Sequence, residues 1–149
     1  MATETLELRK SRGAFFTPPE LADFICHWAV RSPNDTVLEP SCGEAAFLLP
    51  AGQRLRALGA NPAPVPQLNG VEIHGDSATQ AVQLLGELGL TAAIKVANFF
   101  DEAPSKSFDV VIGNPPYIRY QEFFGVDRLK SQRAALAQGV RLAGLASSW

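Results

Sequence analysis

The segment Asn114-Pro115-Pro116-Tyr117 contains the residue types most specific for chemistry in this 149-residue sequence. It follows an apolar run at 108–112 that predicts a strand, and this strand must stop at the prolines because they cannot donate backbone hydrogen bonds. Asn114 contributes a side-chain carbonyl, and Tyr117 contributes a flat face with a polar tip. The prolines also fix their own backbone carbonyls in space, so this carbonyl of Asn114 and a proline carbonyl give two acceptors beside an aromatic face. Such a pair suits a planar exocyclic amine, because hydrogen bonds from both amine hydrogens free the nitrogen lone pair to attack a methyl group. The alternative is a strand terminator without chemistry.

Three earlier strands, expected at 36–39, at 68–73 and within 92–99, also end in polar or aromatic residues. In an open parallel sheet, ligands bind where the carboxyl ends of the strands meet. Gly43, after the first strand, permits a tight turn and close backbone approach to a ligand. Glu72, at the end of the second, suits a ribose diol, because a carboxylate accepts two hydroxyl hydrogen bonds at once. Together they suggest an adenosine-containing cofactor, although a structural turn glycine and a solvated carboxylate would look the same.

Helices are expected around and between these strands. Thr17 is placed to cap the first helix, with Pro18 at its first position and Glu20 completing a capping box. Its large apolar side chains recur at helical spacing and predict one buried stripe, formed by Leu21, Phe24, Ile25 and Trp28. Further helices are expected at 47–58, 77–88 and about 127–142. This alternation predicts an α/β fold with a parallel sheet and helices on both faces.

The composition is that of a globular protein, with 46% hydrophobic and 19% charged residues and a net charge of −2. This charge disfavours a free-standing nucleic-acid binder, which usually has a basic face. Cys26 and Cys42 do not make a disulfide framework, so a reducing, cytoplasmic setting is expected. No signal peptide or long apolar run is found, so no membrane association is expected. His27 and His74 lack ligand spacing to the cysteines, so no metal is expected.

The chain resembles the amino-terminal part of adenine-N6-specific DNA methyltransferases of restriction–modification type, whose cofactor motifs precede an Asn-Pro-Pro-Tyr motif. The resemblance covers about residues 12–120 and implies a Rossmann-like fold with S-adenosylmethionine as cofactor. Residues 13–18 would close over the methionine end of the cofactor, 39–43 would form its loop, Glu72 would hold the ribose and residues 98–99 the adenine. The cofactor-binding residues implied are Phe16, Thr17, Pro18, Glu39, Pro40, Ser41, Cys42, Gly43, Glu72, Ile73, Asn98 and Phe99.

The same resemblance assigns catalysis to Asn114, Pro115, Pro116 and Tyr117. Asn114 and Pro115 would accept hydrogen bonds from the amine of a flipped-out adenine, and Tyr117 would stack on the base. Ala45 departs from the family pattern by replacing a glycine, which costs about 1 kcal/mol or more if the backbone there is left-handed. Its methyl group could also press on the cofactor. Asn98 departs by replacing an aspartate, whose charge it lacks.

The family's complete sheet has further strands and is followed by a target-recognition region, neither of which is found here. We therefore expect a partial catalytic domain over 1–149, with a capping segment and helix (1–35), a cofactor-binding and catalytic core (36–120), and a following loop and helix (121–149). Most DNA contacts would come from a complementing chain or the remainder of a longer protein. Two alternatives stay open: methyl transfer to a protein glutamine amide or an RNA base amine, and a non-catalytic cofactor-binding remnant.

Overall fold

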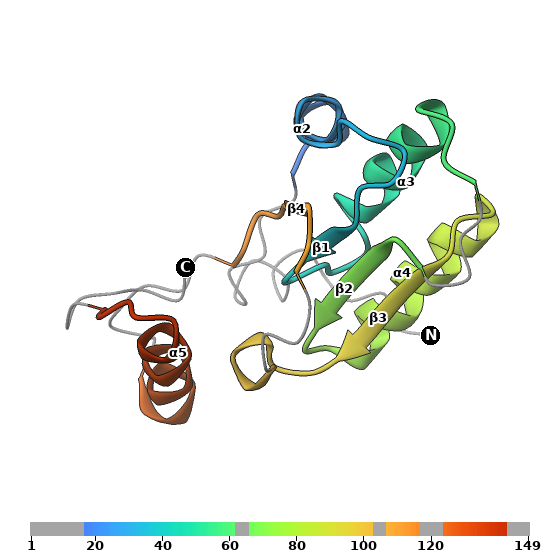
Figure 1. The fold of residues 1–149 in the computed structure, drawn as a ribbon. Coiled ribbons are helices and arrows are strands. Elements are labelled where there is room, and N and C mark those ends of the chain that lie inside the picture. Colours follow the sequence, from blue (N-terminus) through green and yellow to red (C-terminus); the bar gives the residue numbers. More distant parts are fainter. Residues whose placement is uncertain (1–16, 62–65, 103–106, 117–123, 143–149) are drawn as a thin grey trace. The chain divides into compact units, whose positions relative to one another are not determined.

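The computed structural model describes residues 17–61, 66–102, 107–116 and 124–142 (Figure 1). The chain divides into two compact units, one of residues 17–114 and the other of residues 1–16 with 115–149. The first unit contains the sheet, and the second contains helix α5, Gly125–Ala137. The finer division expected from the sequence, with boundaries at residues 35 and 120, stays a prediction.

The sheet is parallel, with strand order β3-β2-β1-β4. Its strands are β1 (Val37–Glu39), β2 (Leu68–Glu72), β3 (Ala92–Val96) and β4 (Val110–Val111). In register, Val37 of β1 lies between Leu68 of β2 and Val110 of β4. The chain moves outward from β1 to β3 and then returns to the other side of β1. The strand order therefore reverses between β1 and β4, which is where open α/β sheets bind ligands.

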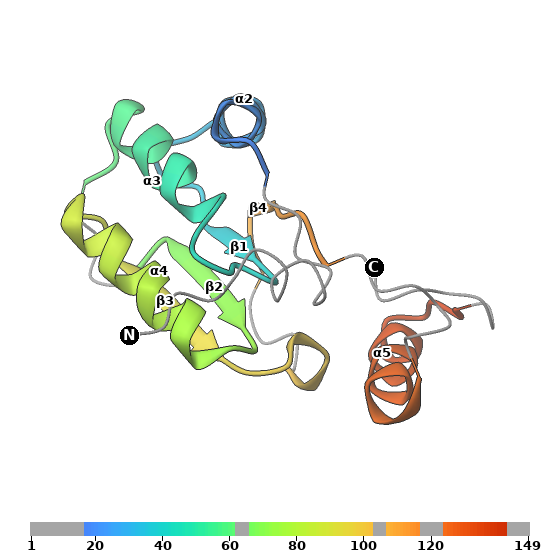
Figure 2. The same cartoon turned by 180° about the vertical axis from the view of Figure 1, so that it is seen from behind.

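Helices α3 (Leu48–Ala57) and α4 (Gly75–Glu87) connect the first three strands. Helix α3 packs on β1 and β2, and α4 packs on β2 and β3. Both lie on the same side of the sheet, as the two opposite views in Figures 1 and 2 show. The core between them includes Val37, Leu48, Leu55, Leu68 and Leu85, each no more than 4% exposed. The predicted α/β class and parallel sheet are confirmed, whereas a helical layer on the second face stays a prediction.

Helix α2 (Pro19–Ala29) begins without the cap that the sequence suggests. Pro18 occupies the N-cap position, and no side chain caps the helix. The predicted capping box of Thr17 and Glu20 is therefore wrong. The reason is local geometry: a residue that precedes proline is held in an extended conformation, so Thr17 lies outside the helix, and its hydroxyl has another partner, Asn114.

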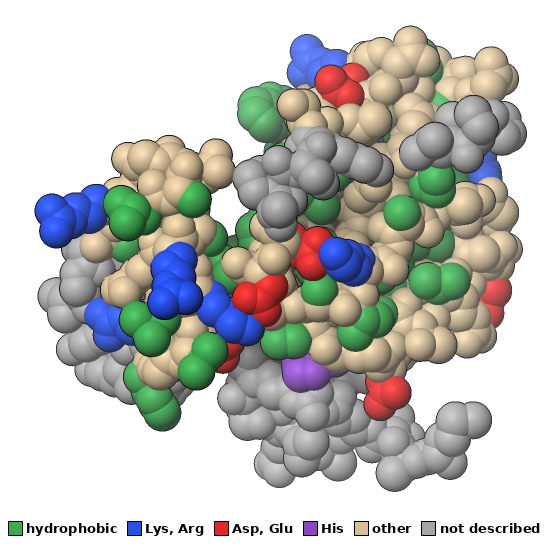
Figure 3. Space-filling model, turned by 60° about the horizontal axis from the view of Figure 1, so that its bottom comes forward, with side chains coloured by type: hydrophobic (Ala, Val, Ile, Leu, Met, Phe, Trp, Pro, Cys, Tyr) green, Lys and Arg blue, Asp and Glu red, His purple; other side chains and the backbone are tan. Residues whose placement is uncertain are grey.

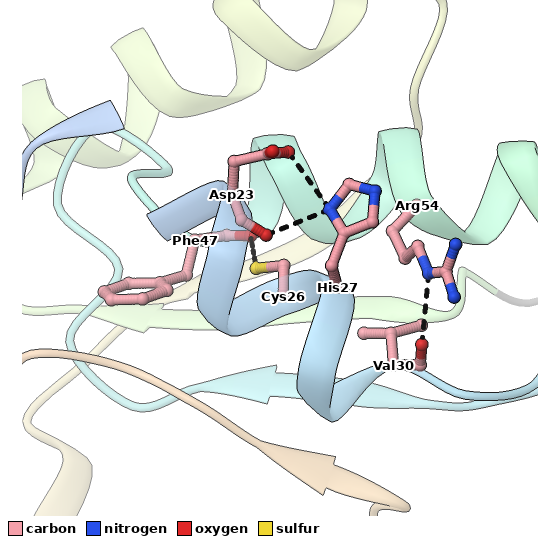
Figure 4. Close-up of polar contacts among 6 residues, drawn as sticks. All are labelled: Asp23, Cys26, His27, Val30, Phe47 and Arg54. Carbon is pink, nitrogen blue, oxygen red and sulfur yellow. Dashed lines mark hydrogen bonds and ion pairs between the residues drawn. The ribbon is translucent and has the colours of Figure 1, made fainter. Parts of the chain in front are cut away.

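The buried face of α2 also differs from the predicted stripe. Leu21, Phe24 and Trp28 are 47%, 69% and 71% exposed, whereas Ala22 and Cys26 are buried. Helix α2 packs on α3, and the Cys26 thiol donates a hydrogen bond to the Phe47 carbonyl oxygen at 3.5 Å (Figure 4). Only small side chains permit such a close approach to the neighbouring backbone. The small face of α2 therefore enters the core, and the large apolar face points outward.

Helix α5 is shorter than predicted. It ends at Ala137, followed by the C-cap residue Gln138 and by Gly139 with a φ of +78°. A left-handed glycine at this position is a common helix terminator. Across the part of the chain that the structure describes, no helix combines the length and the apolar character needed to span a bilayer.

Candidate functional site

The carboxyl ends of the strands bring together most of the residues selected from the sequence. Glu39 ends β1, Glu72 ends β2, Asn98 follows β3 and Asn114 follows β4. Figure 3 turns this edge of the sheet, where β2 and β3 end, toward the viewer.

Two residues of the loop after β1, on either side of Glu44, have left-handed backbone. Gly43 has a φ of +50° and Ala45 a φ of +69°. The loop is closed by the Ala45 amide donating to the Cys42 carbonyl at 2.8 Å, and it is tied to β2 by the Cys42 amide donating to Val71 at 3.0 Å. The condition stated for Ala45 is therefore met, because its backbone is left-handed. Ala45 is only 1% exposed, so its methyl group is shielded from solvent, and its contact with a cofactor stays a prediction.

Glu39 is held below this loop and is 1% exposed. Its Oε2 accepts hydrogen bonds from the backbone amides of Leu48 at 2.9 Å and Phe47 at 3.3 Å. These are amides at the start of α3, which has no side-chain cap of its own. Burial raises the pKa of the Glu39 carboxyl to about 8. Glu39 thus secures the start of α3, and its contact with a cofactor stays a prediction, as do those of the half-buried Pro40 and Ser41.

Glu72 joins two of the strand-end segments. Its Oε2 accepts from the Gly43 amide at 2.8 Å, and its Oε1 accepts from the His74 amide at 2.9 Å. Each oxygen has a second lone pair that can accept a hydroxyl hydrogen bond. Ile73 beside it is 56% exposed, although an isoleucine after a strand usually packs inward.

Gly70 in β2 was not selected from the sequence, yet the site depends on it. A Cβ at this position would lie 2.8 Å from the Cys42 sulfur, so a side chain would displace the loop. A glycine inside a strand pattern is a known sign of close backbone approach, and this signal was present in the sequence. Cys42 itself is buried, so its side chain packs under the loop and does not face solvent. Burial raises the pKa of its thiol to about 12.

Asn98 and Phe99 lie where β3 gives way to the short 3-10 helix η1, Phe99–Asp101. The Asn98 Oδ1 accepts from the Phe100 amide at 3.0 Å and caps this helix. Phe99 is 39% exposed and meets Phe100 edge to face, with ring centroids 6.1 Å apart. The exposed ring of Phe99 and the exposed Ile73 supply apolar surface of the kind that a purine ring contacts.

Asn114 is partly buried, and its Nδ2 donates to the Thr17 Oγ1 at 3.2 Å. This bond brings the predicted closing segment and the predicted catalytic segment together, although they are 97 residues apart in sequence. Pro115 and Pro116 follow without secondary structure. Phe16 and Tyr117 lie outside the described residues, so their predicted roles stay predictions.

The strand-end groups fit an adenosine-containing cofactor. Glu72 offers acceptor positions for ribose hydroxyls, and Ile73 and Phe99 offer apolar faces for a base. A Cβ built on Gly43 would meet no atom within 4 Å, so the loop has open space beside it. Within the described ranges, no group of three or more His, Cys, Asp or Glu residues could hold a metal ion.

Known proteins resemble the chain in both sequence and fold. Residues 1–137 match the N-6 DNA Methylase family. The chain is 37% identical over 147 residues to the type II methyltransferase M.PaeR7I of Pseudomonas aeruginosa, an alignment covering 79% of this chain and 26% of that protein. It is 28% identical over 85 residues, 56% of this chain and 28% of the relative, to a ribosomal protein uL3 glutamine methyltransferase of Bordetella pertussis. The chain thus spans about a quarter of the length of these relatives.

Among solved structures, the type I restriction enzyme EcoKI M protein matches with a TM-score of 0.62 and 21% identity. The match covers 70% of this chain and 26% of that one, and it establishes the fold. A methyltransferase solved with S-adenosylhomocysteine has the same fold at a TM-score of 0.56. The predicted Rossmann-like methyltransferase fold is therefore confirmed, and S-adenosylmethionine is the cofactor of the family concerned. With a family match over most of its length, this chain belongs to the N-6 DNA methylases.

Proposed function

We propose that this chain carries the S-adenosylmethionine-binding and catalytic part of an enzyme that methylates the N6 amine of adenine in DNA, as part of a restriction–modification system. The observation that supports this most is the position of Asn114. It follows β4, at the point where the strand order reverses, and lies in the same edge of the sheet as Glu72 and Asn98. This position supports the proposal because the same edge of the sheet would then carry both the amide acceptor and the groups that suit an adenosine cofactor.

In this proposal, Glu72 accepts hydrogen bonds from the ribose, and Ile73 and Phe99 contact the adenine of the cofactor. S-adenosylmethionine supplies an electrophilic methyl group when bound. Asn114 Oδ1 and the Pro115 carbonyl oxygen accept the two amine hydrogens of the target base, and the nitrogen lone pair forms the new bond to carbon as the carbon–sulfur bond breaks. The methylated amine then releases one proton to solvent water, and S-adenosylhomocysteine is the second product. No charged base is needed before the attack, so positioning is the main catalytic contribution.

The target base must leave the DNA stack to reach Asn114, at a cost of a few kcal/mol. We propose that Tyr117 stacks on the flipped base. Because the net charge is −2, most phosphate contacts would come from a partner chain or from other parts of a longer protein. The buried, unpaired Cys26 and Cys42 are consistent with the reducing cytoplasm as the site of action.

A second candidate is methyl transfer to a protein glutamine amide. The similarity to a ribosomal protein glutamine methyltransferase favours it, and an amide nitrogen presents the same two hydrogens to Asn114. An RNA base amine and a non-catalytic remnant are the remaining alternatives.

The test is product analysis after incubation with methyl-labelled S-adenosylmethionine. Duplex DNA, ribosomal RNA and a glutamine-containing protein are supplied separately, and products are digested to nucleosides or amino acids. We expect N6-methyl-2′-deoxyadenosine from DNA, lowered at least about a hundredfold by Asn114→Ala, as for removal of a transition-state hydrogen-bond partner. Asn34→Ala, at an exposed turn, is the matched control and should retain activity. Label recovered in methylglutamine or in RNA would favour the alternatives.

A further inference from the structure

The hydrogen bond between Thr17 and Asn114 has a consequence for catalysis. Thr17 was expected to cap α2, but no side chain caps that helix. Its hydroxyl oxygen instead accepts from the Asn114 Nδ2 at 3.2 Å, in a partly buried position. The Thr17 hydroxyl, which does not cap α2, thus contacts the Asn114 side chain, to which the proposed chemistry is assigned.

Both residues of this pair are held on stiff backbone. Each is followed by two prolines, in Thr17-Pro18-Pro19 and in Asn114-Pro115-Pro116. A residue before proline is restricted to extended conformations, so neither Cα has the usual freedom.

The segment that carries Thr17 is also fixed by the packing of α2. The Cys26 thiol donates to the Phe47 carbonyl, and Arg54 Nε donates to the Val30 carbonyl at 3.3 Å (Figure 4). Both bonds tie α2 to α3 and the turn before it. The Thr17 oxygen is therefore a fixed reference point for the amide of Asn114.

We propose that Thr17 is a positioning residue that sets the orientation of the Asn114 amide. With Nδ2 donating to Thr17, Oδ1 is the amide atom directed away from Thr17, toward a substrate amine. In the opposite orientation the Thr17 hydroxyl would donate to Oδ1, and the amide would present an NH2 group to the NH2 group of the substrate, where two donors cannot bond. This inference rests on the proposed function, and it adds to the cofactor contact that the family resemblance assigns to Thr17.

The first test is nuclear magnetic resonance of the 15N-labelled full chain, with the Asn114 side-chain NH2 pair assigned by its loss in Asn114→Asp. We expect Thr17→Val, which replaces the hydroxyl with a methyl group of similar size, to shift this pair. Thr17→Ser should restore it, and Thr79→Val, at an exposed threonine of α4, should leave it unchanged. Unchanged resonances in Thr17→Val, or a Thr17→Ser variant that behaves like Thr17→Val, would overturn the proposal. If Thr17→Val does not fold, the wild-type protein decides through the temperature coefficients of the chemical shifts of the two Nδ2 protons. One proton with a small coefficient supports the hydrogen bond, and two equally steep coefficients contradict it.

The second test is the methyl-transfer rate at saturating cofactor and DNA. We expect kcat to fall about two- to tenfold in Thr17→Val, the loss of one neutral hydrogen bond in the transition state, with recovery in Thr17→Ser. An unchanged kcat in a folded Thr17→Val variant would overturn the role. If the methyl group goes to glutamine or RNA rather than to adenine in DNA, the proposed function fails, whereas the resonance experiment still decides the Thr17–Asn114 bond by itself.

Discussion

Replacing Glu39 with glutamine should change how the stability of this protein depends on pH. Glu39 is 1% exposed, and burial raises the pKa of its carboxyl from 4.5 to about 8. The folded state therefore holds a proton at Glu39 that the unfolded chain releases. The stabilisation from the neutral carboxyl is complete below about pH 4.5 and is lost as the pH rises toward 8.

The size of this effect follows from proton linkage. Between the two pKa values, the free energy of unfolding should fall by about 1.4 kcal/mol for each pH unit, so by roughly 2–3 kcal/mol from pH 5.5 to 7.5. In Glu39→Gln, the amide oxygen can accept the same hydrogen bonds from Phe47 and Leu48 without a titrating group. The variant should therefore lose this part of the pH dependence and gain stability relative to wild type as the pH rises.

The assay is urea unfolding at half-unit pH steps, followed by circular dichroism, for wild type and Glu39→Gln. Glu20→Gln, at an exposed position of α2, is the control and should follow wild type at every pH. If wild type and Glu39→Gln lose stability in parallel from pH 5.5 to 7.5, Glu39 is not the buried neutral carboxyl described here, and the reasoning fails.

Two further predictions concern the loop after β1 and the two buried thiols. Ala45→Gly should change the free energy of unfolding by less than about 1 kcal/mol. Relief of about 1–2 kcal/mol of left-handed strain is offset by the greater chain entropy of glycine in the unfolded state and by the loss of a buried methyl group. A change above about 2 kcal/mol in urea unfolding would contradict this balance. Cys26 and Cys42 are buried with thiol pKa values raised to about 12, so Ellman's reagent at pH 8 should modify neither until urea unfolds the chain. Rapid modification of either thiol in the folded protein would contradict its burial.

The sequence was sufficient to predict the strands and what lies at their ends. Examples are the near-continuous apolar run at 108–112 and the glycine-containing turn after residue 39. Neighbouring residues largely determine such features, so tertiary packing does not change them. A left-handed backbone at Ala45 was only a condition raised by the family pattern, which has glycine there, and the structure meets this condition with a φ of +69°.

The contacts that join distant segments could not be predicted in this way. Helical spacing identified the large apolar residues of α2, but the close packing against α3 selects the face with Ala22 and Cys26. Thr17 satisfies a capping pattern, yet its hydroxyl bonds a side chain 97 residues away. Glu39 looked like a ligand-facing carboxylate, and only the position of α3 shows that its Oε2 secures a helix start.

The most direct test of the central claim, that the strand ends form the cofactor site, is calorimetric titration with S-adenosylhomocysteine. Ile73 at the end of β2 and Val82 on α4 are 56% and 52% exposed, so truncating either should leave the fold intact. We predict one site in wild type, unchanged affinity in Val82→Ala, and affinity lowered about five- to tenfold in Ile73→Ala through lost apolar contact. No binding by the wild-type chain, or equal affinities in the two variants, would contradict the account.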